Sequence, residues 1–285
     1  MATQDLTLVI GATGNVGRRV VRHLVDEGHR TRAFVREPES AALPETVEVA
    51  QGDLTVVSTL DRALSGVDSV FLLWPYLTLD DAPAVVDAIA AHARRVVYLS
   101  SAGILDDQDE QIDPINRFHA GIERLIEKSG LEWTFLRCGS FAATVFDWAD
   151  QIREGVVREA FGNAARVMIH EADIAAVAVR ALTGEGHNGR KYVLTGPEAV
   201  TQVEQVRLVS EAIGRPVRFE EITADELRRN MLAEGWQPAD IEGLIEAYIQ
   251  MSTVEQPTTT TVKDITGRPA RTFREWAADH AQDFR

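Results

Sequence analysis

The sequence has little cysteine, no long apolar run and no surplus of basic charge. Cys138 is the only cysteine among 285 residues, so no disulfide can form within the chain. No apolar run reaches the roughly 18 residues that suggest a membrane span. Acidic residues outnumber basic ones by 44 to 29, and there is no long basic stripe to bind nucleic acid. A basic-then-apolar leader is also missing. We therefore expect a cytoplasmic protein without membrane or nucleic-acid partners.

The amino-terminal segment has the pattern of a strand, a glycine turn and a helix. An apolar run over residues 6–10 leads into three glycines, and apolar residues at helical spacing follow. Gly11 suits the positive φ of a sharp turn, Gly14 lets the backbone approach a pyrophosphate, and Gly17 lets the helix pack close to the strand. Gly28 suits the end of the helix. The free N–H groups and the dipole at the start of the helix favour a phosphate.

The glycine spacing, G-x-x-G-x-x-G, is one residue longer in its first step than the usual dinucleotide fingerprint. A glycine turn without a ligand is therefore the alternative. The strand and helix on either side favour a dinucleotide site. We expect cofactor contacts from Gly11, Thr13, Gly14, Asn15, Val16 and Gly17.

Strand and helix patterns alternate along the first half of the chain. Strands are predicted at 32–35, 46–50, 69–73, 96–101 and 133–137, with helices near 56–64, 81–93 and 116–128. This alternation requires right-handed crossovers and a parallel sheet covered on both faces. We therefore expect an α/β fold, a Rossmann-like doubly wound parallel sheet, in a single domain of residues 1–285. Residues from about 139 have shorter elements and are expected to form a smaller C-terminal α/β substrate lobe.

The ends of the predicted strands carry candidates for binding the rest of the nucleotide. About twenty residues past the glycine turn an acid usually binds the ribose 2′-hydroxyl, whereas Arg36 suits a 2′-phosphate. This favours NADP(H), with NAD(H) as the alternative; a solvated arginine is the plainer interpretation. Asp53 is placed to meet the adenine or its ribose, although an acid there also suits a helix N-cap. Trp74 either walls the nicotinamide side of the pocket or is a core tryptophan. The expected cofactor contacts in this part are Arg36, Asp53, Leu54, Leu73, Trp74 and Pro75.

The order of these motifs resembles a known family. They are Gly11-Ala12-Thr13-Gly14-Asn15-Val16-Gly17, Val35-Arg36-Glu37-Pro38, Gly52-Asp53-Leu54, Tyr98-Leu99-Ser100-Ser101-Ala102 and Leu136-Arg137-Cys138-Gly139. The chain resembles an atypical short-chain dehydrogenase of the NmrA-like group over nearly its whole length. That group includes NAD(P)H-dependent quinone, azo-dye and triphenylmethane-dye reductases, and also redox-sensing regulators that bind the nucleotide without turnover. The resemblance implies an NAD(P) cofactor.

The sequence departs from the short-chain dehydrogenase pattern at the catalytic pair. A Tyr-x-x-x-Lys pair usually follows the fifth strand, but here the nearest equivalent is His119 and Glu123. Residues at i and i+4 share a helical face, and a neighbouring carboxylate raises the pKa of an imidazole. We therefore expect His119 to be a proton donor, or the pair to be only a structural contact. Ser100 and Ser101, at the end of the strand, are candidates to orient a carbonyl unless the backbone satisfies them.

The segment after the sixth strand is the candidate substrate wall. Three aromatics within eight residues suit a flat, apolar partner or a core flap. Cys138 is expected to be a buried small hydrophobe, since no base adjoins it. The expected substrate contacts are Cys138, Gly139, Phe141, Phe146 and Trp148.

The first functional hypothesis is an NADPH-dependent oxidoreductase that transfers hydride to a small aromatic, quinone-like or conjugated acceptor. The alternatives are an NADP-binding redox sensor without turnover and a non-redox biosynthetic enzyme on the same fold. A monomer or a homodimer is expected. The acidic residues Asp106, Asp107, Asp109 and Glu110 lack the spacing of a calcium loop and have no His or Cys partner, so no metal site is expected.

Overall fold

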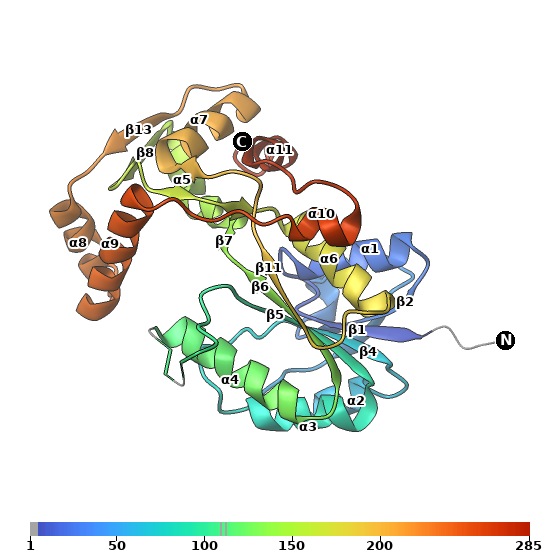
Figure 1. Cartoon of the computed structure of the whole chain (residues 1–285). Helices are drawn as coiled ribbons and strands as arrows, with labels where there is room; N and C mark the ends of the chain where they lie inside the picture. The colour runs from blue at the N-terminus through green and yellow to red at the C-terminus, as the bar shows by residue number, and fades with distance from the viewer. Residues whose placement is uncertain (1–4, 109, 112) are drawn as a thin grey trace. The chain divides into compact units, whose positions relative to one another are not determined.

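The structure is a computed structural model, and it describes residues 5–108, 110–111 and 113–285 (Figure 1). The chain divides into two compact units. The first contains Met1–Gly139, Glu171–Leu194 and Thr261–Arg268, and the second contains Ser140–His170, Thr195–Thr260 and Pro269–Arg285. The chain thus leaves the first unit after Gly139 and returns to it twice. Asp109, one of the four acidic residues of the 106–110 segment, lies outside the described residues.

A seven-stranded parallel sheet forms the centre of the first unit. Its order is β3-β2-β1-β4-β5-β6-β11, and every neighbouring pair is parallel. The strands are β1 (Leu6–Ile10), β2 (Arg30–Val35), β3 (Glu48–Gln51), β4 (Ser69–Leu72), β5 (Arg95–Ser101), β6 (Glu132–Cys138) and β11 (Arg190–Leu194). This is the strand order of a doubly wound dinucleotide-binding fold, so the predicted fold class is confirmed.

Helices cover both faces of this sheet. Figure 1 shows α1 and α6 above it and α2, α3 and α4 below it. The helices are α1 (Gly17–Asp26), α2 (Val57–Ala63), α3 (Ala82–His92), α4 (Pro114–Lys128), α6 (Glu171–Thr183) and α10 (Thr261–Thr266), with a 3₁₀ turn η1 (Pro38–Ser40). Strands β1 and β4 are buried along their whole length, as expected of a sheet covered on both faces.

The order of strands places the ligand-binding edge of this unit. The chain winds outward from β1 in one direction through β2 and β3, and in the other through β4, β5 and β6. In such sheets ligands bind beyond the carboxyl ends of the strands, at the point where the winding reverses. The glycine turn follows β1 at this point, and Arg36 follows β2 at the same edge.

The second unit has its own core and three two-stranded sheets. β7 pairs with β10 and β8 with β13 in parallel, whereas β9 pairs with β12 antiparallel. Trp276, Phe273 and Phe284 are fully buried in its core. Its elements are β7 (Ser140–Phe141), η2 (Ala142–Trp148), α5 (Ala149–Glu154), β8 (Val156–Glu159), β9 (Ala165–Arg166), β10 (Met168–Ile169), β12 (Val200–Thr201), α7 (Gln202–Ile213), β13 (Arg218–Glu221), α8 (Ala224–Ala233), α9 (Pro238–Thr253) and α11 (Phe273–Asp279).

One predicted strand begins later in the structure than its sequence pattern indicates. The strand predicted at 46–50 begins only at Glu48, because the N–H of Val47 closes a turn on the carbonyl of Pro44. Within the described residues, no helix combines the length and the apolar character needed to cross a bilayer.

Candidate functional site

The glycine turn has the geometry that its three glycines predict. Gly11 has a φ of +81°, and the N–H of Gly14 donates to the carbonyl of Gly11 at 3.0 Å. A Cβ on Gly17 would lie 2.0 Å from the carbonyl oxygen of Gly11. No side chain fits at position 17, so this glycine is what allows α1 to begin directly against the turn.

Backbone N–H groups at the start of α1 are free to bind an anion. Among the described residues, the N–H groups of Asn15, Val16 and Gly17 have no hydrogen-bond acceptor. No side chain caps this helix, and its first turn contains no acidic residue. Three adjacent free donors at the positive end of a helix dipole form an anion site. The arrangement fits the pyrophosphate of a dinucleotide.

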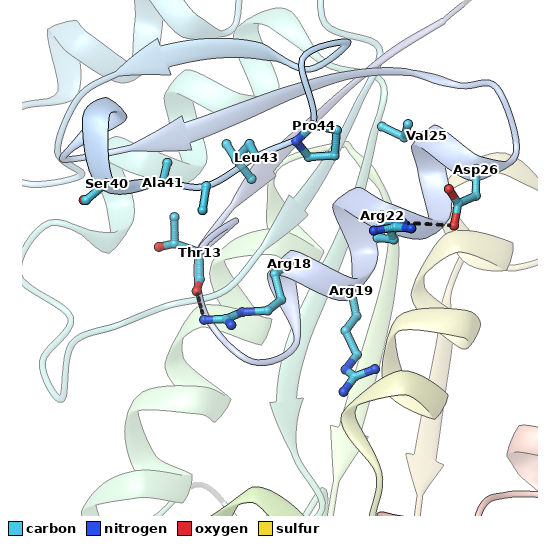
Figure 2. Close-up of a pocket in the computed structure, with 11 residues that line it drawn as sticks. Thr13, Arg18, Arg19, Arg22, Val25, Asp26, Ser40, Ala41, Leu43 and Pro44 are labelled. Carbon is cyan, nitrogen blue, oxygen red and sulfur yellow. Dashed lines mark hydrogen bonds and ion pairs between the residues drawn. The ribbon is translucent and has the colours of Figure 1, made fainter. Parts of the chain in front are cut away.

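A basic cavity of about 750 Å³ lies beside the turn (Figure 2). Arg18 and Arg22 of α1 line one side of it, and Ser40, Leu43 and Pro44 line the other. Arg18 donates to the carbonyl of Thr13 at 2.8 Å, so its guanidinium is held over the glycine turn. The sequence analysis did not assign a role to Arg18.

A second pocket, of about 380 Å³, contains Arg36 and Asp53. Across residues 5–108, 110–111 and 113–285, the guanidinium of Arg36 forms no hydrogen bond or ion pair. Oδ1 of Asp53 accepts from the N–H and hydroxyl of Thr55 and from the hydroxyl of Tyr76. The hydrogen bonds from Thr55 and Tyr76 lower the pKa of Asp53. Asp53 is not the N-cap of α2, because Val56 holds that position without a side-chain bond.

The other predicted cofactor residues differ in how far their side chains are exposed to solvent. Trp74 is 6% exposed in the apolar core, and its Nε1 donates to the carbonyl of Thr78 at 3.0 Å. This burial fits the core alternative, and a cofactor contact from Trp74 stays a prediction. Leu54 is buried in the same core, whereas Leu73 is partly exposed next to Gly11 and Pro75 is exposed. Cofactor contacts from Leu54, Leu73 and Pro75 stay predictions.

The expected contact between His119 and Glu123 is wrong. The carboxylate of Glu123 binds Arg137 of β6 at 2.6 Å and accepts from Ser100 at 2.6 Å. Arg137 also pairs with Asp106 at 2.8 Å, and this guanidinium holds the pKa of Asp106 well below its usual range. Because a buried arginine attracts the buried carboxylate, Glu123 is unavailable to the imidazole.

Arg137 was missed as a functional candidate by the sequence analysis, although a signal was present. It is a charged residue that follows Phe135 and Leu136 near the end of a buried strand, and its side chain is 6% exposed. A buried charge requires a partner. The sequence alone does not show which acidic residue is the partner of Arg137.

His119 instead contacts Tyr98. Its Nδ1 lies 2.6 Å from the hydroxyl of Tyr98, which is fully buried on β5. Burial lowers the pKa of His119 to about 4, with a smaller opposing effect of Asp113. The expected rise in the pKa of His119 is therefore also wrong: the imidazole is neutral at pH 7.

The two candidate serines both have partners inside the first unit. Ser100 is buried and donates to Glu123, which matches the alternative that the fold satisfies it. Ser101 is partly exposed and donates to Oδ1 of Asn116 at 2.6 Å. The side chain of Asp113 accepts from the N–H of Asn116 and so caps α4. The catalytic roles of Ser100 and Ser101 stay predictions.

The predicted substrate wall divides between the two units. Cys138 and Gly139 belong to the first, and burial raises the pKa of the Cys138 thiol, so it stays protonated. Phe141, Phe146 and Trp148 belong to the second. Phe146 packs against Trp276 and Phe284 in that unit's core, with ring centroids 5.2 and 5.3 Å away. Trp148 lines a cavity of about 620 Å³. Substrate contacts from these residues stay predictions.

Comparisons with known proteins agree with this geometry. A family model described as NAD(P)H-binding matches residues 11–185. The chain is 42% identical over 282 residues to the (4-alkanoyl-5-oxo-2,5-dihydrofuran-3-yl)methyl phosphate reductase of Streptomyces griseus, covering 98% of this chain and 99% of the relative. It is 35% identical over 291 residues to the NAD(P)H azoreductase of Xenophilus azovorans, with coverage of 98% and 99%.

A solved structure shows the same fold. It is the triphenylmethane reductase of Citrobacter sp. complexed with NADP(H), with a TM-score of 0.77 and 24% identity. The alignment covers 96% of this chain and 99% of that one.

Proposed function

The chain belongs to the NAD(P)H-binding family and is an NAD(P)H-dependent reductase, and we propose that it uses NADPH to reduce a small conjugated carbonyl acceptor. The predicted resemblance to NAD(P)H-dependent reductases and the predicted oxidoreductase activity are confirmed. The preference for NADPH and the class of acceptor are our proposals. The observation that carries the cofactor preference is the row of three free N–H groups at Asn15, Val16 and Gly17, together with the unpaired guanidinium of Arg36 at the end of the neighbouring strand β2.

The residues of the turn fit the cofactor. When bound, NAD(P)H supplies a hydride. The N–H groups of the glycine turn hold the pyrophosphate, and no acidic side chain in the first turn of α1 repels it. Arg36 takes the 2′-phosphate that distinguishes NADPH, because an arginine binds phosphate through charged hydrogen bonds. Asp53 contacts the adenosine in this proposal, and its hydrogen bonds from Thr55 and Tyr76, which hold its carboxylate in one orientation, support that role.

The acceptor class follows from the names of the two curated relatives. The Streptomyces griseus reductase is named for a dihydrofuranone whose ring C=C bond is conjugated with two carbonyl groups, and the other relative is an azoreductase. Both names describe an electron-poor double bond. Hydride addition to such a bond gives a stabilised anion, so the chain must mainly position the acceptor and does not need a strong acid. This agrees with the replacement of Tyr-x-x-x-Lys by His119 and Glu123.

A turnover assay tests the proposal. The purified protein is mixed with NADPH and a panel of quinones, azo dyes and alkanoyl-butenolide phosphates, and loss of the reduced-cofactor absorbance is followed. Products are examined by mass spectrometry with NADPH deuterated at C4. We expect oxidation with the conjugated carbonyl compounds and transfer of one deuterium to carbon, with no reaction of the saturated analogue. Tight NADPH binding without oxidation by any acceptor would contradict the proposed chemistry.

A further inference from the structure

We propose that His119 is an uncharged hydrogen-bond donor to the acceptor oxygen on which negative charge develops, and that the buried hydroxyl of Tyr98 positions it by setting its tautomer. The inference rests on the proposed function, since it needs a conjugated carbonyl acceptor. It replaces the expected imidazolium acid by a neutral N–H group. Nothing in the family comparisons assigns either residue.

The contact between the two residues is close and enclosed. Tyr98 lies in β5, next to β4 and β6, with no solvent exposure. Its hydroxyl is 2.6 Å from Nδ1 of His119, which lies in the second turn of α4. Phe118 and Phe135 pack near the two rings, with centroids 4.2 Å from His119 and 6.2 Å from Tyr98. The hydrogen bond is therefore shielded from water and held in one geometry.

The direction of this hydrogen bond follows from burial. Burial raises the pKa of Tyr98 well above its ordinary value, with Glu123 adding to the effect, so its hydroxyl keeps its proton. If Nδ1 of His119 donated, the buried hydroxyl hydrogen of Tyr98 would need another acceptor, and the described residues offer none. If Tyr98 donates, both groups are satisfied. A neutral imidazole that accepts at Nδ1 carries its hydrogen on Nε2.

Nε2 of His119 is open on its outer side. Within the part of the chain that the structure describes, Nε2 forms no hydrogen bond. The atom is also not fully buried, since among the described residues the fully buried side-chain atoms without a partner are Nε of Arg166 and Oε1 of Gln202. Nε2 is therefore reachable by solvent or by a ligand. β5 ends at Ser101, whose hydroxyl donates to Oδ1 of Asn116 in the first turn of α4 at 2.6 Å. The start of α4, and with it His119, therefore lies near the edge of the sheet where ligands bind.

The charges around this pair do not offset the effect of burial on the imidazole. Asp113, at the start of α4, is the charged group that acts on His119, and it does not outweigh burial. Glu123 is engaged by Arg137 and Ser100, and no hydrogen bond joins it to the imidazole. A neutral histidine can polarise a carbonyl as a hydrogen-bond donor without giving up a proton.

The reaction step balances without an acid from the chain. A hydride, with its electron pair, forms a new C–H bond at the electron-poor carbon of the acceptor. The C=C π pair shifts, and the carbonyl oxygen becomes an enolate oxygen while the oxidised nicotinamide nucleotide is left. The N–H at Nε2 of His119 stabilises this oxygen by a hydrogen bond, and water later supplies the proton to carbon.

Nitrogen NMR tests the tautomer directly. The protein is labelled with ¹⁵N-histidine, and the resonances of His119 among the seven histidines are identified by their loss in His119→Gln. We expect a protonated Nε2 and an unprotonated Nδ1 at pH 7, and a mixture of tautomers in Tyr98→Phe. A protonated Nδ1, or an imidazolium at pH 7, would overturn the assignment. This readout does not depend on activity or on the acceptor.

Kinetics test the donor role. We expect His119→Phe to lower kcat by about 100-fold, the usual loss of one oxyanion donor, while NADPH affinity is unchanged. His119→Gln keeps an N–H donor and should recover most of the rate. The matched control is Tyr192→Phe, which breaks a second Tyr–His pair in the same unit, His187 Nδ1 to Tyr192 hydroxyl at 2.8 Å. It should leave the rate unchanged.

The outcomes separate this inference from the proposed function. An active wild type with an equally active His119→Phe would overturn the donor role and leave the proposed function intact. A wild type that binds NADPH but reduces no acceptor would overturn the proposed function and the donor role together, and NMR would still decide the tautomer.

Discussion

The arginines near the glycine turn differ in the hydrogen bonds and ion pairs that their guanidinium groups already form. Arg18 donates to the carbonyl of Thr13, and Arg19 pairs with Glu171 at 2.9 Å. Among the described residues the guanidinium of Arg36 forms no hydrogen bond or ion pair, although it shares a pocket with Asp53, whose carboxylate attracts it. An unpaired guanidinium loses no existing ion pair when it binds a phosphate. This makes Arg36 the strongest candidate for recognition of the 2′-phosphate.

We expect Arg36→Met to reduce the preference for NADPH over NADH by about 10- to 100-fold, because a hydrogen bond to a charged group contributes about 1.5–3 kcal/mol. Activity with NADH should change little. The measurement is kcat/KM with each cofactor. Arg62→Met removes the same charge from the same pocket and serves as the control. An unchanged preference in Arg36→Met would show that the 2′-phosphate is bound elsewhere.

His119 should also make stability depend on pH. Its pKa is about 4 in the folded protein and about 6.5 when unfolded. Between these values the unfolded chain binds more protons, so stability is fully present above about pH 6.5 and is lost as the pH falls toward 4. The change is on the order of 3 kcal/mol, because one pKa unit corresponds to about 1.4 kcal/mol. Urea unfolding at a series of pH values, for wild type and His119→Gln, should show a shallower dependence in the variant; parallel curves would contradict this prediction.

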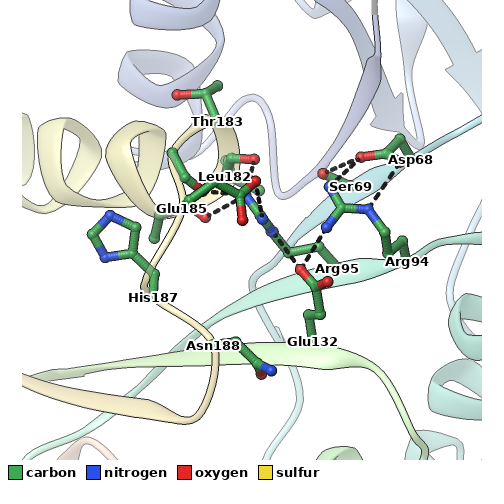
Figure 3. Close-up of polar contacts among 12 residues, drawn as sticks. Asp68, Ser69, Arg94, Arg95, Glu132, Leu182, Thr183, Glu185, His187 and Asn188 are labelled. Atoms are coloured by element: carbon green, nitrogen blue, oxygen red, sulfur yellow. Dashed lines mark hydrogen bonds and ion pairs between the residues drawn. The ribbon is translucent and has the colours of Figure 1, made fainter.

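At the scale of single elements, the carboxyl end of α6 depends on one buried side chain. Arg95, at the start of β5, is 5% exposed and donates to the carbonyls of Ala181, Leu182 and Gly184 (Figure 3). It also pairs with Glu132 at 3.1 Å. The last carbonyls of a helix lack intrahelical donors, so Arg95 ends α6 and attaches it to the sheet.

We expect Arg95→Met to lower the free energy of unfolding by about 2–4 kcal/mol, because it leaves the buried carbonyls at the end of α6 without their donor. Arg94→Met is the matched control. Its neighbouring guanidinium also pairs with Glu132 but is 44% exposed, and exposed pairs contribute at most about 1 kcal/mol. Urea denaturation measures both variants. Equal losses would mean that the carbonyl contacts of Arg95 add nothing to stability.

On the scale of the whole molecule, the cofactor should act as a ligand of the folded state. At an NADPH concentration of about 100 times Kd, binding adds about 2.7 kcal/mol, which for a chain of this size corresponds to a rise in Tm of about 5–10 °C. Thermal scans with NADPH and NADH measure it. NADPH should give the larger shift, and Arg36→Met should remove the difference. No shift with either nucleotide at millimolar concentration would contradict a dinucleotide site.

Patterns that are local along the chain could be interpreted without the structure. The strand, the glycine turn and α1 are adjacent in sequence, and buried strands such as β4 are continuous apolar runs, so composition and spacing predicted them together with the parallel sheet. Arg36 and Asp53 were placed correctly at strand ends for the same reason. Each of these predictions needed only the identity of neighbouring residues.

The partners of the buried polar groups were decided by tertiary structure. Helical spacing placed His119 and Glu123 on one face, but β6 brings Arg137 to Glu123 and β5 brings Tyr98 to His119. A buried charge binds the strongest opposite charge within reach, and which groups are within reach depends on the order of strands in the sheet. The sequence by itself therefore determined the fold class and the glycine turn that precedes α1, because both follow from local patterns. Only the packing of β5, β6 and α4 determined that His119 is neutral, because this packing buries the imidazole against Tyr98 and brings Glu123 to Arg137 instead.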